Sequence, residues 1–263
     1  MATDKRARKR EVRAAREEAL RRRRNTRLAV FAVILLGLIG GVVFAGRDTD
    51  KAEQKAVTPN SSPDAAAEVA CGGEPPPEAD PQQYDEPAQV LEEGIDYRAV
   101  ISTSCGDIEM DLFEDEFPKT VNSFVFLARE SFYDGLTFHR IVANFVIQGG
   151  DPEGTGGGGP GYDVPDEFPN KGNVYEFGVV AMANAGPGTT GSQFFVVTHL
   201  DPNGNPAPAG LDPLYSLLGR VDNSSFEVIR DINQQETFGG NDPARAEQPI
   251  VPVFINSVEI IEA

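Results

Sequence analysis

The sequence contains few of the residues that bind metals or nucleic acids. Its 263 residues include only two histidines, His139 and His199, which lie far apart and have no cluster of Cys, Asp or Glu beside them. A metal site is therefore not expected. Beyond residue 27 the chain is also poor in basic side chains, with 11 Lys and Arg against 37 Asp and Glu. Because such an acidic body repels nucleic-acid phosphates, we expect no DNA or RNA partner.

Tryptophan is absent, and only two cysteines occur, Cys71 and Cys105. An even number of cysteines in an oxidising compartment permits one disulfide bond between them. Two unpaired thiols are the alternative. Cys105 shows no sequence pattern of an activated nucleophile, since histidines elsewhere in the chain do not define a catalytic dyad.

Long apolar runs are missing except for one, which follows a strongly basic segment. Residues 1–27 hold 12 Lys and Arg and 4 Asp and Glu, within an overall charge of −18. Residues 28–45 (LAVFAVILLGLIGGVVFA) then carry no charge over 18 positions, just enough for a helix to cross a bilayer core. A basic flank stays in the cytoplasm. We therefore expect a single-pass protein of the cell membrane, with residues 1–27 cytoplasmic and the acidic body extracytoplasmic.

A cleaved signal peptide is the rival interpretation of this region. The small residues near Ala45, before Gly46, look like a cleavage site. However, the basic segment is unusually long, and the apolar run exceeds the usual core of a signal peptide. These features favour an uncleaved signal anchor over residues 28–45, with the lipid bilayer as its partner.

The next 50 residues differ in composition from the rest. Residues 46–95 are acidic, rich in Pro and Ala, and poor in large apolar side chains, so they cannot bury enough surface to fold alone. We expect a linker there, followed by a folded domain over residues 96–263.

The pattern of the domain predicts a mainly β fold. Apolar and polar residues alternate over residues 97–112 around a glycine-containing turn, which is typical of a β-hairpin. Pro118 suits the first turn of a helix, and a second helix is expected near Ser224 with Glu227 completing a capping box. We expect residues 251–261 to form a closing strand. Many short strands with two helices indicate a closed antiparallel barrel with helices over its ends.

The most specific signals are two motifs that follow a Tyr-Asp-Gly turn at residues 133–135. Residues 138–151 read FHRIVANFVIQGGD, and residues 182–187 (MANAGP) continue to GSQFF at residues 191–195. In order and spacing they resemble the cyclophilin family of peptidyl-prolyl cis-trans isomerases, from about residue 97 to residue 262. The resemblance implies an eight-stranded barrel that acts on proline-containing segments of unfolded or folding proteins. No cofactor is needed, because rotation about a peptide bond breaks no covalent bond.

The resemblance also implies the site residues. Arg140 matches the catalytic arginine, whose rigid fork of donors can bond the prolyl nitrogen as its lone pair localises there. Gln148 matches the glutamine that orients the arginine and contacts substrate. The matching substrate-binding positions are Phe145, Val146, Ala183, Asn184, Ala185, Gln193, Phe195, Leu211 and Tyr215.

Two positions depart from the family pattern. Gly210 stands where many members carry a tryptophan that cyclosporin uses, so cyclosporin sensitivity is in doubt. Tyr215 stands where many carry a histidine, but its aromatic ring can wall a pocket and its hydroxyl remains available. We expect activity to survive both changes in a monomeric catalytic domain. A barrel retained only as a binding module or scaffold, with negligible turnover, is the alternative.

Two further features are discounted. Residues 154–161 (GTGGGGPG) lack the Gly-Lys-Ser/Thr ending of a phosphate-binding loop, so we interpret them as a surface loop near the site. His139 is expected to be a packed, hydrogen-bonded residue rather than a catalytic base.

Overall fold

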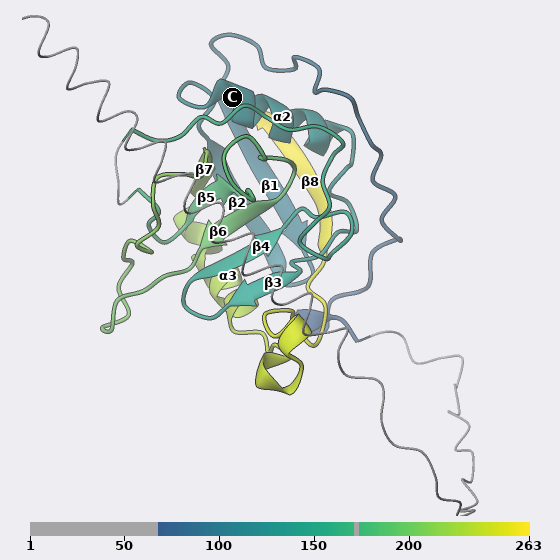
Figure 1. Cartoon of the computed structure of the whole chain (residues 1–263), viewed down its shortest axis with the longest axis vertical. Helices are drawn as coiled ribbons and strands as arrows, with labels where there is room; N and C mark the ends of the chain where they lie inside the picture. Colours follow the sequence, from purple (N-terminus) through teal and green to yellow (C-terminus); the bar gives the residue numbers. More distant parts are fainter. Residues whose placement is uncertain (1–67, 171–173) are drawn as a thin grey trace, which may run out of the picture. The chain divides into compact units, whose positions relative to one another are not determined.

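Eight antiparallel strands pair into one sheet in the order β3-β4-β6-β5-β7-β2-β1-β8 (Figure 1). The computed structural model describes residues 68–170 and 174–263. Two α-helices and four 3-10 helices accompany the sheet in this part of the chain. The elements are η1 (Ala70–Gly72), β1 (Tyr97–Thr103), β2 (Gly106–Leu112), α2 (Pro118–Arg129), β3 (Arg140–Val142), β4 (Val146–Gly149), β5 (Val179–Met182), β6 (Phe194–Val197), β7 (Leu217–Val221), η2 (Asn223–Ser225), α3 (Phe226–Asn233), η3 (Gly239–Asn241), η4 (Pro243–Arg245) and β8 (Ile255–Glu262).

The predicted hairpin and the closing strand are confirmed. β1 pairs with β2 through a register in which Ile101 faces Ile108, and with β8 on its other edge. Alternate residues of β1, among them Ala99 and Ile101, are buried, whereas those between them are half-buried. Period-two alternation therefore identified the buried face correctly.

The sheet does not close into a barrel, and this part of the prediction is wrong. β3 and β8 are the two edge strands, and only isolated contacts such as the bridge between Thr137 and Phe254 connect their neighbourhoods. β3 has three residues, and the Ile141 N–H within it donates to the carbonyl of Glu247 rather than to β8. The segment before β8 thus takes the edge that closure would need. The result is a half-barrel of eight antiparallel strands.

The two predicted helices are present, but one begins differently. α2 has Pro118 in its first turn, buries most of its residues and packs against β8 and β7. α3 packs against β2, β3 and β4. Instead of a capping box on Ser224, Asp222 accepts a hydrogen bond from the Ser224 N–H at 2.9 Å and starts η2, which leads into α3. Asp222, the residue directly before η2, therefore provides a side-chain cap for η2, and α3 itself begins after Ser225 without one.

Adjacent residues of the central strands serve two separate apolar clusters. On β6, Phe194 belongs to the large core, where it meets Phe124, Tyr133 and Phe138 edge to face. The next residue, Phe195, belongs to a smaller cluster on the opposite face. Because side chains alternate along a strand, the same short strand supports the core with one face and offers an aromatic ring to the outer face with the other.

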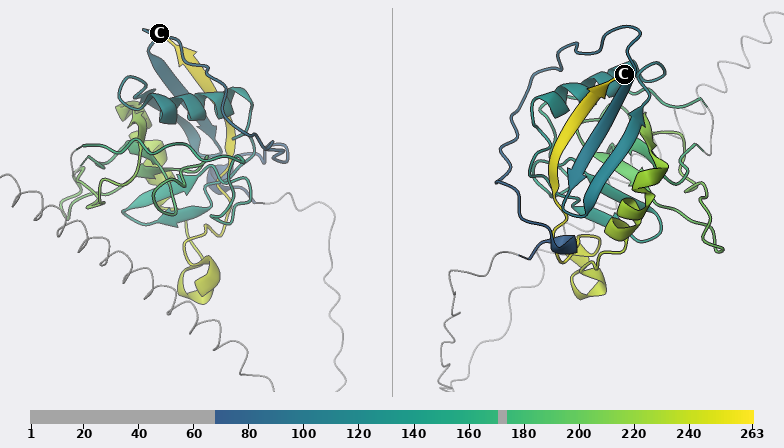
Figure 2. Two further views of the ribbon diagram at one scale, coloured as in Figure 1. Left: turned by 45° about the horizontal axis from the view of Figure 1, so that its top comes forward. Right: turned by 180° about the vertical axis from the view of Figure 1, so that it is seen from behind.

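The segment before β1 packs along the domain instead of leaving it. Figure 2 (right) shows this segment, in blue, running along the side of the sheet from η1 toward the start of β1. Tyr84 meets Phe126 edge to face at 5.0 Å between ring centroids, and its N–H donates to Pro160 at 2.8 Å. The buried Asn122 on α2 accepts from the Val90 N–H at 2.8 Å. The part of the predicted linker (residues 46–95) that the structure describes therefore contacts the domain at several points.

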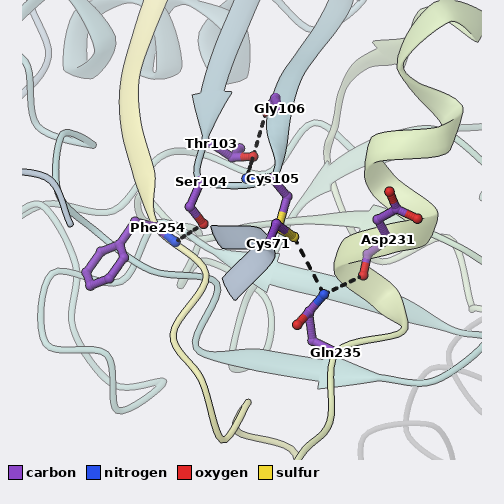
Figure 3. The surroundings of a disulfide bond; sticks show 8 residues. All are labelled: Cys71, Thr103, Ser104, Cys105, Gly106, Asp231, Gln235 and Phe254. Carbon is purple, nitrogen blue, oxygen red and sulfur yellow. Dashed lines mark hydrogen bonds between the residues drawn. A yellow bond between two sulfur atoms is a disulfide. The ribbon is translucent and has the colours of Figure 1, made fainter. Parts of the chain in front are cut away.

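A disulfide bond ties the start of this segment to the hairpin. Cys71 in η1 is bonded to Cys105 in the turn between β1 and β2, with 5.0 Å between their Cα atoms (Figure 3). The Gln235 side chain, just beyond α3, donates to Cys71 Sγ at 3.6 Å and to the Asp231 carbonyl at 3.0 Å. Of the two alternatives for the cysteines, the structure has the bridged one.

The contact of this segment with Gly135 gives a stability prediction. Gly135 has φ +78°, and a Cβ there would lie 2.8 Å from the carbonyl oxygen of Pro77 and 3.0 Å from the nitrogen of Ala79. Gly94 has the same φ, +78°, but open space around it. Gly135→Ala should lower the free energy of unfolding by about 1–3 kcal/mol more than Gly94→Ala, because left-handed strain is common to both and overpacking is not. Urea unfolding of both variants measures the difference, and equal losses would contradict the packing of this segment.

The predictions for residues 1–67, including the basic segment 1–27 and the anchor 28–45, lie outside the described residues. Within residues 68–170 and 174–263, no helix combines the length and apolar character needed to span a membrane.

Candidate active site

Strand register brings three predicted site residues side by side on the outer face of the sheet. Arg140 on β3 lies opposite Gln148 on β4, and Gln148 lies opposite Phe195 on β6. Directly opposed residues of antiparallel strands project to the same face. The tight connection between β3 and β4 adds Phe145, with a left-handed Asn144 (φ 54°) just before it. A hairpin and one further strand therefore assemble a cation, an amide and two aromatic rings.

These residues surround a pocket of about 170 Å³, and six of its nine lining side chains are apolar or aromatic. This volume suits one compact side chain rather than a cofactor. Phe195, one of its lining residues, is almost fully buried. The Tyr215 ring stands perpendicular to the Phe195 ring, with 5.3 Å between centroids. The pocket is lined by Arg140, Phe145, Val146, Gln148, Ala183, Asn184, Phe195, Leu211 and Tyr215.

One edge of the pocket is polar and hydrogen-bonded as a chain. Arg140 Nη1 donates to Gln148 Oε1 at 3.2 Å, and Gln148 Nε2 donates to Gln193 Oε1 at 3.0 Å. Gln193 Nε2 then donates to the Gly158 carbonyl at 2.9 Å. The glycine-rich loop is thereby connected to the arginine through two amide side chains, which fixes the orientation of each.

Two predicted residues, Ala185 and Gln193, lie outside the apolar pocket. They line a neighbouring pocket of about 560 Å³, whose wall also includes residues 156–161 and Gln83. Gln148, Ala183 and Asn184 line both pockets, so the predicted residues form one continuous site with two compartments. The glycine-rich loop, which the sequence analysis interpreted as a surface loop near the site, forms part of this wall.

The segment of Ala183, Asn184 and Ala185 runs along the boundary between these pockets. The Ala183 N–H donates to the Gln193 carbonyl at 2.8 Å, and the Ala185 N–H donates to Thr189 Oγ1 at 2.8 Å. Within the described part of the chain, the Asn184 N–H has no acceptor. An extended ligand passing along this segment would find a free donor at Asn184 and not at its two neighbours.

His139 is packed, as expected, but among the described residues it forms no hydrogen bond. It is 8 % exposed, and neither ring nitrogen has a partner among the described residues. Burial lowers the pKa of His139, Asp151 opposes this shift, and the charge of Arg140 lowers the pKa further. The lowered pKa favours the neutral imidazole, which would add no positive charge next to Arg140. In the described part of the chain, no three His, Cys, Asp or Glu side chains converge as a metal site would require.

Sequence reasoning missed two residues that support the site. Glu247 Oε2 accepts from Arg140 Nε in an ion pair, across 107 positions of sequence. Tyr175, 1 % exposed, donates its hydroxyl to the Tyr215 carbonyl at 2.8 Å and accepts from the Tyr215 N–H at 3.1 Å. Nothing in the local pattern around either residue indicates these contacts, because both depend on the tertiary fold.

Comparisons with known proteins concern the same part of the chain. A family model described as cyclophilin type peptidyl-prolyl cis-trans isomerase/CLD matches residues 98–260. The chain is 40% identical over 178 residues to the peptidyl-prolyl cis-trans isomerase A of Mycobacterium tuberculosis (strain H37Rv), covering 62% of this chain and 91% of that protein. It is 38% identical over 177 residues to the probable isomerase A of Mycobacterium leprae, with the same coverage of 62% and 91%.

The fold of this chain is also similar to that of a solved structure. It is the cyclophilin type peptidyl-prolyl cis-trans isomerase of Cryptosporidium parvum, crystallised in the presence of the dipeptide Ala-Pro. The TM-score is 0.52 at 30% sequence identity, and the match covers 62% of this chain and 98% of that chain.

Proposed function

The chain belongs to the cyclophilin-type peptidyl-prolyl cis-trans isomerase family, and we propose that it rotates Xaa-Pro bonds of extracytoplasmic proteins in the pocket between Arg140 and Phe195. That it is a peptidyl-prolyl cis-trans isomerase follows from the family. The assignment of roles to its residues, and the place where it acts, are the proposal. The observation that carries the first part is a guanidinium at the rim of a small apolar pocket.

The pocket suits the chemistry of proline isomerisation. Amide resonance gives a peptide bond a barrier of about 18–20 kcal/mol, and Xaa-Pro bonds exchange over tens to hundreds of seconds unaided. In this proposal Phe145, Val146, Phe195, Leu211 and Tyr215 hold the proline ring. Arg140 donates to the prolyl nitrogen when the twisted amide localises its lone pair. Stronger binding of the twisted state than of either planar state accelerates rotation.

The peptide around the proline needs an extended path. Its backbone would pair with the free N–H of Asn184, much as an added strand pairs with a sheet edge. Gln148 contacts the substrate and holds Arg140, while Ala183, Ala185 and Gln193 shape the wall beside the residues before proline. A monomeric catalytic unit is part of this proposal. The Ala-Pro dipeptide named with the Cryptosporidium structure is consistent with this class of ligand.

Isomerisation of a short Xaa-Pro peptide, followed by NMR exchange spectroscopy, tests the site assignment. Wild-type protein and a Phe195→Ala variant should differ mainly in KM, because the ring removed contacts the bound proline in ground and transition states alike. Unchanged kinetics in a folded Phe195→Ala variant would move the site elsewhere.

The N-terminal sequence carries the second part of the proposal, a place of action outside the cytoplasm. The basic residues 1–27 and the apolar residues 28–45 have the order of a signal anchor that leaves the following domain outside. The disulfide between Cys71 and Cys105 supports an oxidising compartment. The substrates would then be secreted and membrane proteins whose folding is limited by the isomerisation of Xaa-Pro bonds.

Protease treatment of intact cells tests this topology. The domain should be degraded in intact cells, whereas a variant lacking residues 28–45 should be protected until the cells are lysed. A domain released into the soluble extracytoplasmic fraction would instead indicate cleavage near Ala45. Protection of the full-length protein in intact cells would overturn the proposed orientation.

A further inference from the structure

A hairpin-like segment between α3 and β8 brings an acidic side chain to the outer side of Arg140. Glu247 Oε2 accepts a hydrogen bond from Arg140 Nε, while Arg140 Nη1 donates to Gln148 Oε1 at 3.2 Å on the other side. The guanidinium is therefore held at two points of its plane. Within the described part of the chain, its Nη2 group donates to no protein acceptor. The pairings leave that group available at the rim of the pocket.

The segment that carries Glu247 is fixed by its own hydrogen bonds. The Glu247 carbonyl accepts from the Ile141 N–H at 2.6 Å, next to Arg140 on β3. The Phe238 N–H donates to the Gln248 carbonyl at 3.1 Å, and the guanidinium of Arg245 lies 3.5 Å from the centre of the Phe238 ring. Because the backbone on either side of Glu247 is already ordered, the carboxylate loses less conformational freedom on pairing than a free surface side chain would.

We propose that Glu247 is a positioning residue for Arg140, which holds the guanidinium in the plane that lets it donate to the prolyl nitrogen. This inference rests on the proposed role of Arg140. Glu247 does not line the apolar pocket and acts through the arginine. Charge-assisted hydrogen bonds are the geometrically specific ones. A carboxylate on Nε and an amide on Nη1 together limit the rotation that either alone would permit.

A second ion pair in the domain is about as exposed as the pair of Arg140 and Glu247 but lies outside both pockets of the site. Arg140 and Glu247 have side chains that are 35% and 50% exposed, and Arg129 and Glu262 have 36% and 50%. Exposed pairs of this kind contribute little to stability. The two pairs should therefore be similar in stability and differ in catalysis. Arg129 lies at the end of α2, outside both compartments of the site, so Glu262 provides a matched control.

An inhibitory role for Glu247 would predict the opposite change in rate. If the carboxylate held Arg140 away from the substrate, its removal would free the guanidinium and raise the rate. The hydrogen bond from Arg140 to Gln148 argues for positioning, because the arginine keeps its place at the pocket while it is paired with Glu247.

Glu247→Gln and Glu262→Gln, made in the full chain, test the proposal. Glu247→Gln should lower kcat/KM for an Xaa-Pro peptide roughly fivefold, with most of the loss in kcat, because the contact matters when the amide is twisted. Glu247→Asp, which keeps the charge one methylene shorter, should recover part of the loss. Glu262→Gln should leave kcat and KM unchanged, and urea unfolding should give the two glutamine variants equal stability. An unchanged or raised kcat in Glu247→Gln would overturn the proposal.

A double-mutant cycle separates this inference from the role of Arg140 itself. In an Arg140→Ala background, Glu247→Gln should have no further effect on kcat/KM, since the residue through which it acts is gone. The same fivefold loss in that background would show that Glu247 acts by another route. If Arg140→Ala alone left the activity intact, the proposed site would fail. If Arg140→Ala lowered it while Glu247→Gln did not, only the positioning role would fail.

Discussion

Arg140→Ala is expected to lower kcat/KM for an Xaa-Pro peptide roughly 10- to 100-fold. A hydrogen bond from a charged donor contributes about 1.5–3 kcal/mol, and this one would exist only when the prolyl nitrogen has regained its lone pair. An interaction confined to the transition state lowers kcat and kcat/KM together and leaves KM nearly unchanged. The residual activity would come from the apolar pocket, which still binds and desolvates the proline.

The measurement is exchange between the cis and trans peptide, followed by NMR at several substrate concentrations. Arg140→Lys should be intermediate at best, because an ammonium group keeps the charge but cannot bond Glu247 and Gln148 as a rigid fork. Arg220→Ala is the matched control. Arg220 is exposed on β7, pairs with Glu176 at an N–O distance of 3.5 Å, and does not line the pocket. An Arg140→Ala protein that is folded and fully active would remove the basis of the proposed mechanism.

The parts of the fold that sequence predicted are those governed by local pattern. The hairpin of β1 and β2 follows from alternation around Gly106, and α2 follows from Pro118 and helical spacing. Closure of the barrel failed as a prediction because it depends on which long-range partner takes the edge of β3. Nothing near Ile141 indicates that its N–H would bond Glu247 instead of a strand.

Residues 69–95 illustrate a different limit. Their composition indicates that they cannot form a core of their own. It does not exclude packing on a core that already exists, and Val69 and Ala70 are buried in this way. Single contacts such as Tyr84 on Phe126 carry this packing, and no periodicity marks them in advance.

In the candidate site, too, the sequence predicted some residues and not others. Nine of the predicted residues line one pocket. Strand register brings together those on β3, β4 and β6, and the connections next to the strands add the others. The residues that hold these pocket residues in place were not predictable from the sequence. Tyr175 holds the backbone of Tyr215 through two hydrogen bonds, and Glu247 holds Arg140, but both contacts join segments that are at least 40 residues apart.

Removal of the disulfide is expected to have the largest effect on stability. Cys71 and Cys105 are separated by 34 positions, and the bond between them closes a loop that contains most of the packed segment before β1. Closing a loop of this length restricts the unfolded chain, which corresponds to about 3–4 kcal/mol in the free energy of unfolding. In the reduced protein the segment would depend on contacts such as those of Tyr84 and Asn122 alone.

The double variant Cys71→Ala/Cys105→Ala should therefore unfold at a clearly lower urea concentration than the oxidised wild type, by about 3–4 kcal/mol in extrapolated free energy. A reductant should move the wild type toward the variant and should leave the variant unchanged, which separates the bond from the side chains. In the absence of urea, kcat/KM should stay within about twofold, because neither cysteine lines the pocket of Arg140. Equal midpoints for oxidised and reduced wild type would mean that the segment is held by its packing and that the disulfide adds nothing to it.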